Sequence, residues 1–422
     1  MATHKAAATL GIDFGTSNSA AGIMIDGRPH LIELEPGHDT IPTAVFFDFA
    51  ARRMVYGNAA TEALITGEEG RFMRALKSVL GTPLMRETRN LMDEKLTFID
   101  IVGRFLREVK ERAEAATGQV FDRALSGRPV HFHSRDAARD AQAEIDLRAC
   151  YKAAGFTDVT FMFEPEAAAR AYGALPSDKA LGLIVDIGGG TSDFSLFRND
   201  TDGGVEIIGS HGVRVGGTDF DHSLSFDHVM PLFGRGAEIR KEMGQGRLTA
   251  PNALFADLAT WQKIPFLYTG TNLRDVRHLQ KLAVEPQCFA RLSTILRDEL
   301  GHDVAFAVEK GKIATNGSED ATGEVNLSLV EKGLVAPLTD TDLSGSLQNY
   351  ADQICAAALD TLTQVGKGAG DVNRVVFVGG SSLMRIVETA IAQTFPAAER
   401  SHANAFTAVA DGLALSAAHA FR

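Results

Sequence analysis

The sequence predicts an α/β protein with two similar lobes, and three observations carry this prediction. First, an apolar run delivers Asp13 to a tight loop of Gly, Thr and Ser, and the same pattern returns 186 − 13 = 173 residues later at Asp186. Second, each loop precedes an apolar strand, an Asp-Gly hairpin signal and a third strand. Third, strand and helix patterns alternate along the chain. Such repetition predicts two lobes whose loops face each other.

The elements of the first lobe follow in order. Strands are expected at residues 9–12, 20–25 and 29–34, with Asp26-Gly27 as the turn before the third. A turn-rich break at 35–41 precedes a strand at 44–49 and helical spacing at 58–64 and 70–80. An amphipathic helix is expected at 98–116 before Gly118, and a helix at 136–154 before Gly155, because glycine commonly ends helices. Strands at 128–132 and 159–163 and a helix at 166–172 complete the lobe.

The second lobe repeats the plan in an enlarged form. Strands are expected at 183–185, 194–197 and 205–208, with the turn at Asp202-Gly203. Residues 218–265 read as mostly helical, and further helices are expected at 273–283, 290–300, 304–315 and 343–365. A short strand at 374–378 and a helix at 406–419 end the chain. We therefore expect lobe I at 1–176 with 400–422 (upper subdomain about 40–96) and lobe II at 177–399 (enlarged upper subdomain about 217–344).

Composition narrows the class of protein. The chain has 422 residues, of which 45% are hydrophobic and 23% charged, as in globular proteins of two lobes or domains. A net charge of −12 argues against nucleic acid or an anionic membrane as the main partner. No apolar run approaches the roughly 18 residues of a membrane span, and the first residues lack the apolar core of a signal peptide. Three scattered cysteines, Cys150, Cys288 and Cys355, fit reduced thiols, so we expect a cytoplasmic protein.

The two loops predict anion chemistry. Glycines let backbone N–H groups crowd around a phosphate, and Thr and Ser hydroxyls add donors. The aspartates cannot bind phosphate, but they suit a hydrated Mg²⁺. A pair of ordinary hairpins with polar turns is the alternative interpretation. His131 and His133 alternate along an apparent strand, but no third metal ligand is indicated, and a polar strand face is the expected explanation.

Several segments resemble a known family. Residues 11–16 (GIDFGT) and 185–193 (VDIGGGTSD) are similar to the two phosphate motifs of the actin, hexokinase and 70-kDa heat-shock ATPase superfamily. Segments 77–81 (KSVLG), 164–173 (EPEAAARAYG), 215–221 (VGGTDFD) and 376–382 (VFVGGSS) resemble the heat-shock, DnaK-like branch. The resemblance implies a two-lobed actin-like (ribonuclease H-like) ATPase fold around a nucleotide cleft, with ATP or ADP and Mg²⁺ as cofactors. The chain resembles a stand-alone ATPase domain of the YegD-like kind, without a substrate-binding domain.

The resemblance also implies roles for individual residues. Phosphate contacts are expected from Gly15, Thr16, Ser17 and Asn18 of lobe I and from Gly188, Gly189, Gly190 and Thr191 of lobe II. Asp13 and Asp193 would hold Mg²⁺ through water, and Lys77 would supply positive charge beside the γ-phosphate. Lys77, Glu164, Asp186 and Thr191 form the expected catalytic set, with Glu164 or Asp186 orienting or deprotonating the attacking water. The nucleotide site would be completed by Gly216, Gly217, Glu309, Lys312, Gly379, Gly380 and Ser381.

Each role has a plainer alternative. Without the resemblance, Lys77 would be a solvated side chain at a helix end, and Glu164, which precedes Pro165, would be a helix N-cap. Asp186 is harder to explain otherwise, because a carboxylate after three apolar residues needs a partner. Asp219 and Asp221 suit the start of a helix better than catalysis.

The sequence also departs from the family pattern. Ile313 and Leu383 stand where arginines are expected to stack on adenine, which predicts an aliphatic adenine site. The segment 130–133 does not reproduce the usual proline switch before the helix at Asp136. The stretch 221–309 is longer than in the family pattern, so extra helices are expected on lobe II.

Three functions remain open at this point. The leading hypothesis is a Mg²⁺-dependent, chaperone-like ATP-binding protein with slow ATPase activity, in which lobe closure acts on a protein partner or co-chaperone. The second is a small-molecule kinase of the same fold, which needs a deep substrate pocket and an acidic base. The third is an actin-type filament or scaffold protein, against which the turn at 216–221 and the acidic charge argue.

Overall fold

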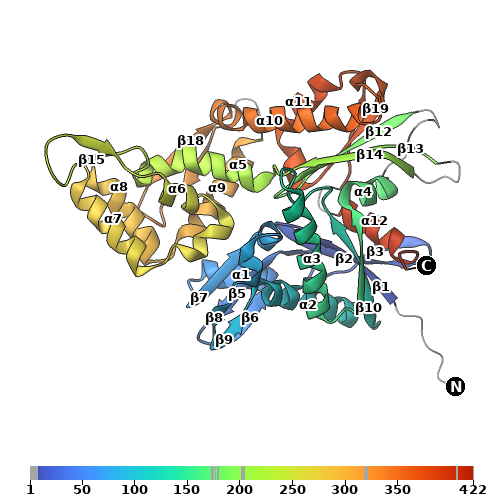
Figure 1. The fold of residues 1–422 in the computed structure, drawn as a ribbon, viewed down its shortest axis with the longest axis horizontal. Coiled ribbons are helices and arrows are strands. Elements are labelled where there is room, and N and C mark those ends of the chain that lie inside the picture. The colour runs from blue at the N-terminus through green and yellow to red at the C-terminus, as the bar shows by residue number, and fades with distance from the viewer. Residues whose placement is uncertain are drawn as a thin grey trace. The chain divides into compact units, whose positions relative to one another are not determined.

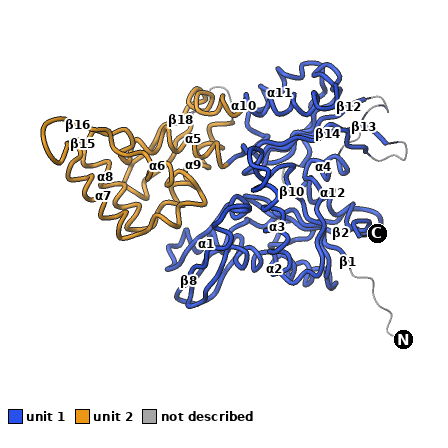
Figure 2. Tube along the Cα trace, in the orientation of Figure 1, with its two compact units in different colours: residues 1–217, 351–422 blue, residues 218–350 orange. Residues whose placement is uncertain are grey.

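The computed structural model describes residues 8–421 apart from 173–174, 176, 178–179, 201–204, 318–321 and 405–406. The chain folds as two compact units, which we describe separately (Figure 2). Unit 1 comprises Met1–Gly217 and Ala351–Arg422, and unit 2 comprises Thr218–Tyr350. Unit 2 overlaps the range expected for the enlarged upper subdomain, while the assignment of the remaining residues to lobes I and II stays a prediction.

The first sheet of unit 1 contains the first copy of the repeated hairpin. Its strand order is β11-β10-β1-β2-β3, and β4 pairs with β2. The strands are β1 (Ala8–Phe14), β2 (Asn18–Ile25), β3 (Arg28–Leu31), β4 (Thr40–Pro42), β10 (Phe121–Arg128) and β11 (Asp158–Phe163). β1 runs antiparallel to β2 and parallel to β10, so the sheet is mixed. The loop after Asp13 therefore lies at the end of a central strand.

The second sheet repeats this plan. Its order is β14-β13-β12-β19-β20, with β12 antiparallel to β13 and parallel to β19. The strands are β12 (Leu181–Ile187), β13 (Ser192–Asn199), β14 (Val205–Val213), β19 (Val372–Val378) and β20 (Glu399–His402). The predicted turn at Asp202-Gly203 lies outside the described residues. The two mixed sheets confirm the predicted α/β fold class.

Two helices join the sheets of unit 1. Figure 1 shows α4 (Glu164–Tyr172) and α12 (Ala408–Ala417) between them. Their small side chains share one core with Leu125 of β10 and Ile184 of β12. A Cβ added at Gly412 would lie 1.7 Å from the carbonyl oxygen of Ala167, so α12 packs directly on the α4 backbone. This close packing brings both repeated loops to one region of the unit.

The other elements of unit 1 flank the first sheet or close the second. A small sheet of β5 (Ala44–Asp48), β6 (Arg53–Tyr56) and β7 (Gly70–Arg74) carries α1 (Gly57–Ile65), and β8 (Arg89–Leu91) pairs with β9 (Glu94–Leu96). The remaining helices are α2 (Phe98–Thr117), α3 (Ala137–Ala154), α11 (Arg385–Thr394) and the end of α10 (Asp340–Thr363). Gly118 and Gly155 end α2 and α3 in the left-handed conformation, as predicted.

Two predicted elements of unit 1 are wrong. Residues 70–80 form β7 and a 3-10 turn (Leu76–Val79), not a helix, because β7 pairs with β5 and that pairing overrides helical spacing. The strand expected at 128–132 lies earlier, at Phe121–Arg128. Pro129, which follows it, has no N–H with which to continue the ladder.

Unit 2 is largely helical. Its helices are α5 (which starts at the boundary, Gly217–Leu224), α6 (Ala253–Leu258), α7 (Gly270–Leu282), α8 (Pro286–Arg297) and α9 (Gly301–Thr315). Two hairpins accompany them, β15 (Glu238–Arg240) with β16 (Arg247–Thr249) and β17 (Thr322–Asn326) with β18 (Val335–Thr339). The first hairpin corrects the prediction that 218–265 is mostly helical. α8 starts before the predicted residue 290 because Pro286 supplies a favoured first turn.

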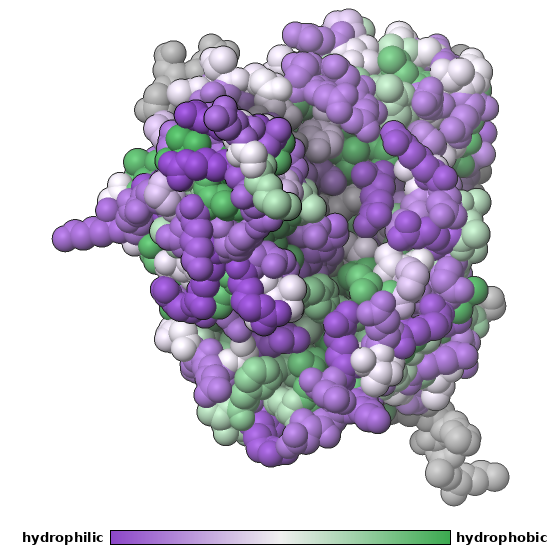
Figure 3. Space-filling view, turned by 60° about the vertical axis from the view of Figure 1, so that its left-hand side comes forward, coloured by the Kyte–Doolittle hydropathy of each residue, from purple (hydrophilic) through white to green (hydrophobic). Residues whose placement is uncertain are grey.

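The surface is mainly hydrophilic on the face seen in Figure 3, where hydrophobic residues appear in small groups. Met243, in the connection between β15 and β16, is a hydrophobic residue that is 88% exposed. Among the described residues, no helix is both long and apolar enough to cross a bilayer.

Candidate functional site

The two repeated loops lie against each other within unit 1. A Cβ added at Gly189 would lie 2.7 Å from the hydroxyl oxygen of Ser17 and 3.1 Å from the Cβ of Thr16. A Cβ added at Gly190 would lie 3.1 Å from the hydroxyl oxygen of Thr16. Glycine at these positions therefore permits a close approach of the two loops that a side chain would obstruct. Gly15 permits a tight turn in the same way, since its Cβ would lie 2.1 Å from the carbonyl oxygen of Asn18.

A third segment supports the second loop. Gly217 N–H donates a hydrogen bond to the carbonyl oxygen of Gly188 at 3.0 Å, and Gly188 N–H donates to that of Thr191 at 3.0 Å. A Cβ added at Gly216 would lie 2.5 Å from the backbone nitrogen of Gly190. The pair at 216–217 thus packs backbone against backbone on the predicted phosphate loop.

The predicted adenosine glycines reach the same place from β19. Gly379 has a φ of +81°, and a Cβ there would lie 2.3 Å from the carbonyl oxygen of Ile187 and 2.8 Å from a carboxylate oxygen of Asp186. Gly380 begins a 3-10 turn (Gly380–Leu383), in which the Ser381 hydroxyl lies 2.4 Å from where a Cβ on Gly217 would sit. Four separate chain segments therefore meet around residues 186–190.

Four carboxylates lie at or near strand ends beside the loops. Asp13 is near the end of β1, and Asp186 and Asp193 are directly opposite each other in the β12–β13 pair. Glu164 begins α4 directly after β11. Asp186, Asp193 and Glu164 are buried, with exposed fractions of 6%, 1% and 8%. Strand ends in two sheets and one helix start therefore concentrate acidic groups in a small volume.

Lys77 is the cation of this cluster. Its Nζ lies 2.5 Å from Oε1 of Glu164, and both side chains are buried. The backbone approaches Lys77 through Ala75, which has a left-handed φ of +58°, and leaves through Gly81 at +75°. Sequence alone also allowed Lys77 to be a solvated lysine and Glu164 to be a plain helix cap. Neither alternative accounts for a buried ion pair between them.

The charges of the cluster shift one another's pKa values. Burial and the Glu164 charge raise the pKa of Asp13 to about 7, against the opposing charge of Lys77. Burial and Glu164 likewise raise the pKa of Asp193 to about 7, although hydrogen bonds from Thr191 and Val130 oppose the shift. Burial and the neighbouring carboxylates place the pKa of Asp186 well above its ordinary value. Burial alone would lower the pKa of Lys77, but the charges of Glu164 and Asp13 raise it overall.

These shifts describe an excess of negative charge in a buried site, because four carboxylates face one ammonium. Among the described residues, no group of three or more His, Cys, Asp and Glu side chains is arranged to hold a metal ion directly. A hydrated Mg²⁺ keeps several waters and needs few carboxylates. Asp13 and Asp193 have the carboxylate chemistry that a cation bound through water would need, and their role as a Mg²⁺ site stays a prediction.

Several supporting contacts were not predicted from the sequence. Val130 N–H donates to Asp193 Oδ1 at 2.6 Å, and Gly81 N–H donates to Asp146 Oδ2 at 3.0 Å. His133 Nε2 lies 2.7 Å from the carbonyl oxygen of Leu80. The role of Asp146 could have been suspected, because an acidic residue on the buried face of a helix needs a polar partner. His133 is not on a strand face, and its role depends on a contact 53 residues away in the chain.

Glu309 and Lys312 belong to α9 of unit 2. Lys312 Nζ lies 2.7 Å from Asp221 Oδ1, and Trp261 Nε1 donates to the other carboxylate oxygen at 3.2 Å. All three side chains are buried, and burial raises the pKa of Asp221 although Lys312 opposes the shift. Ile313 is 63% exposed. Adenosine contacts by Glu309 and Lys312 remain a prediction.

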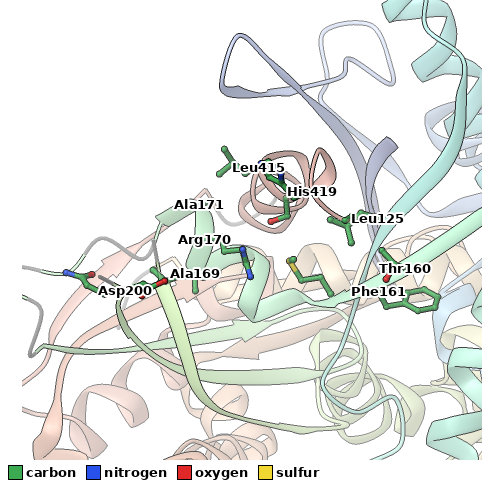
Figure 4. A pocket seen from close by; sticks show the side chains of 14 residues that line it. Leu125, Thr160, Phe161, Ala169, Arg170, Ala171, Asp200, Leu415 and His419 are labelled. Carbon is green, nitrogen blue, oxygen red and sulfur yellow. The ribbon is translucent and has the colours of Figure 1, made fainter. Parts of the chain in front are cut away.

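Figure 4 shows a pocket of about 790 Å³ elsewhere in unit 1. Arg170 and Ala171 of α4, Phe161 of β11 and His419 beyond α12 contribute to its lining. None of the predicted site residues lines this pocket. It therefore gives no support to a substrate pocket beside the two loops, which a small-molecule kinase would need.

Comparison with known proteins identifies similar sequences. The model of a family described as "Hsp70 protein" matches residues 9–91 and 84–250, which together exceed half of the chain. A similar curated protein, the chaperone protein DnaK of Thermoplasma volcanium, is 31% identical over 245 residues. The aligned region is 56% of this chain and 38% of that protein, so the chain matches well under half of the relative's length.

Proposed function

Because the chain belongs to the Hsp70 protein family, we propose that it is a chaperone-like ATP-binding protein that depends on Mg²⁺ and hydrolyses ATP slowly. One observation carries the proposal. The glycines of the second loop pack against the Thr16 and Ser17 side chains of the first, with Asp13, Asp193 and the Lys77–Glu164 pair beside them. Phosphoryl transfer requires little beyond positioned charge and an aligned nucleophile, and the Lys77–Glu164 pair with its neighbouring aspartates supports the first of these.

In the proposed mechanism, the loops bind the β- and γ-phosphates through backbone N–H groups and the hydroxyls of Thr16, Ser17 and Thr191. Asn18, Gly15 and Gly188 shape these loops. Mg²⁺, held through water by Asp13 and Asp193, would neutralise phosphate charge. Lys77 adds positive charge beside the γ-phosphate. Gly216, Gly217, Gly379, Gly380 and Ser381 would form the floor for the adenosine, and a contribution from Glu309 and Lys312 stays a prediction from the resemblance.

We assign Asp186 as the group that orients or deprotonates the attacking water. Burial and the neighbouring carboxylates raise its pKa, which makes the carboxylate more basic than that of an ordinary aspartate. Glu164 is the second candidate, and its ion pair with Lys77 makes it a partner of the cation first. The two roles separate in a pH–rate profile, since loss of the base removes the acidic limb of the profile.

The adenine site is proposed to be unusually aliphatic. Ile313 and Leu383 are 63% and 44% exposed, so both side chains have surface available for contact. The resemblance places an arginine at each position, where a cation–π contact would be worth about 0.5–2 kcal/mol. An Ile313→Arg variant should bind ATP more tightly than the natural protein. Equal affinities would remove position 313 from the adenine site.

Phosphate release from ATP tests the proposed function. We expect slow release that needs Mg²⁺ and that falls in Asp193→Asn. Glucose and glycerol serve as probes for the kinase alternative, which predicts release of ADP without free phosphate. ATP-dependent light scattering tests the filament alternative. Absence of both ATP binding and hydrolysis in the presence of Mg²⁺ would overturn the proposal.

Coupling to a partner extends the proposal. We propose a protein partner or co-chaperone, because a chain with net charge −12 is poorly suited to nucleic acid. The chain matches 38% of the DnaK relative, so client binding is not carried over from that protein. The pocket in Figure 4 is not assigned a partner. A cytoplasmic location remains a prediction.

A further inference from the structure

Besides the Lys77–Glu164 ion pair, hydrogen bonds with three other residues hold the turn that carries Lys77, residues 77–81. Asp146 Oδ2 accepts a hydrogen bond from Gly81 N–H at 3.0 Å, and His133 Nε2 lies 2.7 Å from the carbonyl oxygen of Leu80. Arg214 donates from Nη2 to the carbonyl oxygen of Ser78 at 3.1 Å. The first two come from α3 and the segment before it, whereas Arg214 comes from the other sheet of unit 1, just after β14 (Val205–Val213).

Arg214 belongs to a segment that also supports the second phosphate loop. Ser192 Oγ donates to the carbonyl oxygen of Val215 at 2.8 Å, which fixes this segment to the start of β13. The next residue, Gly216, packs on the backbone of Gly190. On the opposite side, the Ser78 hydroxyl lies 3.6 Å from where a Cβ on Gly190 would sit. The second loop thus lies beside both the Arg214 segment and the Lys77 turn.

The Lys77 turn needs such support. The left-handed conformation is strained for a residue other than glycine and persists where the surroundings enforce it, and Ala75, two residues before Lys77, has this conformation. Glu164 also attracts the Lys77 ammonium away from any second anion. The position of the ammonium therefore depends on how firmly the turn is held.

We propose that Arg214 is a positioning residue for ATP hydrolysis, which clamps the Lys77 turn to the second phosphate loop and so aligns Lys77. This inference rests on the proposed function. A guanidinium suits the task because it stays charged at every working pH and its planar donors hold a carbonyl in a fixed direction. The guanidinium also brings positive charge to Ser78, the residue after Lys77, at a site with an excess of negative charge. The Arg214–Ser78 hydrogen bond connects the segment after β14 with the Lys77 turn. It can form only when the two phosphate loops are correctly placed.

The kinetic expectation follows from the contact. Arg214 touches the Lys77 turn, so its loss should lower kcat while KM for ATP changes by less than about 2-fold. A misplaced catalytic group typically costs one to two orders of magnitude, and we expect about a 10-fold loss in Arg214→Gln. Arg214→Lys, which keeps the charge and one donor, should recover part of that loss.

Arg198→Gln is the matched control. Arg198 is an exposed arginine of the same sheet, paired across β13 and β14 with Glu206 at 2.6 Å. Its replacement should leave kcat and KM unchanged. A kcat for Arg214→Gln equal to that of Arg198→Gln would overturn the proposal.

A double-mutant cycle tests whether Arg214 acts through Lys77. In a Lys77→Ala background, Arg214→Gln should cause no further loss in single-turnover hydrolysis, because there is no ammonium left to align. An unchanged 10-fold loss in that background would show an independent role and would contradict positioning. Arg214 is exposed, so the melting temperature of the single variant should stay close to that of the natural protein.

Amide hydrogen exchange provides a readout without hydrolysis. Exchange at residues 76–81 should be at least about 10-fold faster in Arg214→Gln than in the natural protein, while exchange in β12 stays the same. Unchanged exchange at 76–81 would contradict the clamp even if the natural protein hydrolysed ATP. If the natural protein released no phosphate but the exchange differed, the proposed function would fail and the clamp would stand as a structural contact without a positioning role in catalysis.

Discussion

Asp193 lies at the start of β13, where it accepts a hydrogen bond from Val130 N–H and faces the charge of Glu164. Burial and this charge raise its pKa to about 7 in the folded protein, compared with an ordinary value of 3.8. The folded state therefore binds more protons than the unfolded state between about pH 4 and pH 7. By linkage, the free energy of unfolding contributed by this group decreases as pH rises through that window.

Replacement of Asp193 by Asn should remove this dependence. Measured without metal, the natural protein should lose about 1–4 kcal/mol of stability relative to Asp193→Asn between pH 5 and pH 8. Added Mg²⁺ should stabilise the natural protein at pH 8 more than the variant. Urea unfolding at both pH values checks this, and the comparison cancels titration of the histidines. Parallel pH profiles for the two proteins would contradict the raised pKa.

Lys77→Ala should slow hydrolysis far more than it weakens ATP binding. A cation that meets charge developing in the transition state affects mainly the rate, and the expected loss is about 10²-fold or more. Single-turnover hydrolysis at saturating ATP is the measurement. The variant also leaves Glu164 buried without its partner, so Lys77→Ala with Glu164→Gln serves as the stability control. A single variant as fast as the natural protein would remove Lys77 from the mechanism.

Asp13 and Asp186 were predictable from sequence because each follows an apolar run at a loop, a local pattern, whereas the role of Asp193 came from the resemblance. The Lys77–Glu164 pair was not predictable from local pattern, since its partners are 87 residues apart. The resemblance supplied both residues, but not their contact. Backbone donors such as Val130 N–H leave no trace in residue type, and Arg214 gave no signal for the same reason: its partner is a carbonyl oxygen.

Glycine positions matter at the scale of elements. Gly216 lies before α5, and its missing side chain lets the segment pack on the second loop. Gly216→Ala places a methyl group 2.5 Å from the backbone nitrogen of Gly190, which has no flexible end to move aside. We expect at least a 10-fold loss of ATP affinity, an effect of about 1.4 kcal/mol. Titration with ATP measures it.

Gly345→Ala is the control for this prediction. A Cβ at Gly345 in α10 meets open space, so alanine should leave ATP affinity unchanged and favour the helix slightly. If Gly216→Ala binds ATP as tightly as Gly345→Ala does, the close packing at residue 216 has no part in the nucleotide site.

The buried network of unit 2 gives a second prediction at this scale. Asp221 of α5 joins Lys312 of α9 and Trp261, the single tryptophan of the chain. Asp221→Asn leaves the Lys312 ammonium buried without a counter-charge, which should cost about 3–5 kcal/mol. Thermal unfolding followed by Trp261 fluorescence measures this loss. A further Lys312→Met change should restore much of it, and a double variant no more stable than Asp221→Asn would contradict the buried pair.

The predicted elements show where sequence reasoning works. Long periodic helices such as α2 and α10 were located within a few residues, because spacing and capping glycines are local signals. The stretch 70–80 was misread because a short apolar run suits either a strand or a helix, and its pairing with β5 decides. The β15–β16 hairpin was missed since its strands are three residues each.

At the scale of the whole molecule, duplication explains why the two repeated loops lie together in unit 1. Two mixed sheets share one core through α4 and α12, so the loop after each repeated strand meets its counterpart. The sequence predicted this fold class from the repeat and from its resemblance to the heat-shock family. It gave no measure of the excess of buried carboxylates, because that quantity depends on packing between distant segments.

The central claim is that the paired loops and their carboxylates form a Mg²⁺-dependent nucleotide site. Calorimetric titration of the natural protein with ATP, with Mg²⁺ and then with chelator, tests it most directly. The account predicts that Mg²⁺ tightens ATP binding at least about 10-fold, a gain of about 1.4 kcal/mol, and that this gain disappears in an Asp13→Asn, Asp193→Asn double variant. ATP affinity that is the same with Mg²⁺ and with chelator, or a Mg²⁺ effect that survives in the double variant, would contradict it.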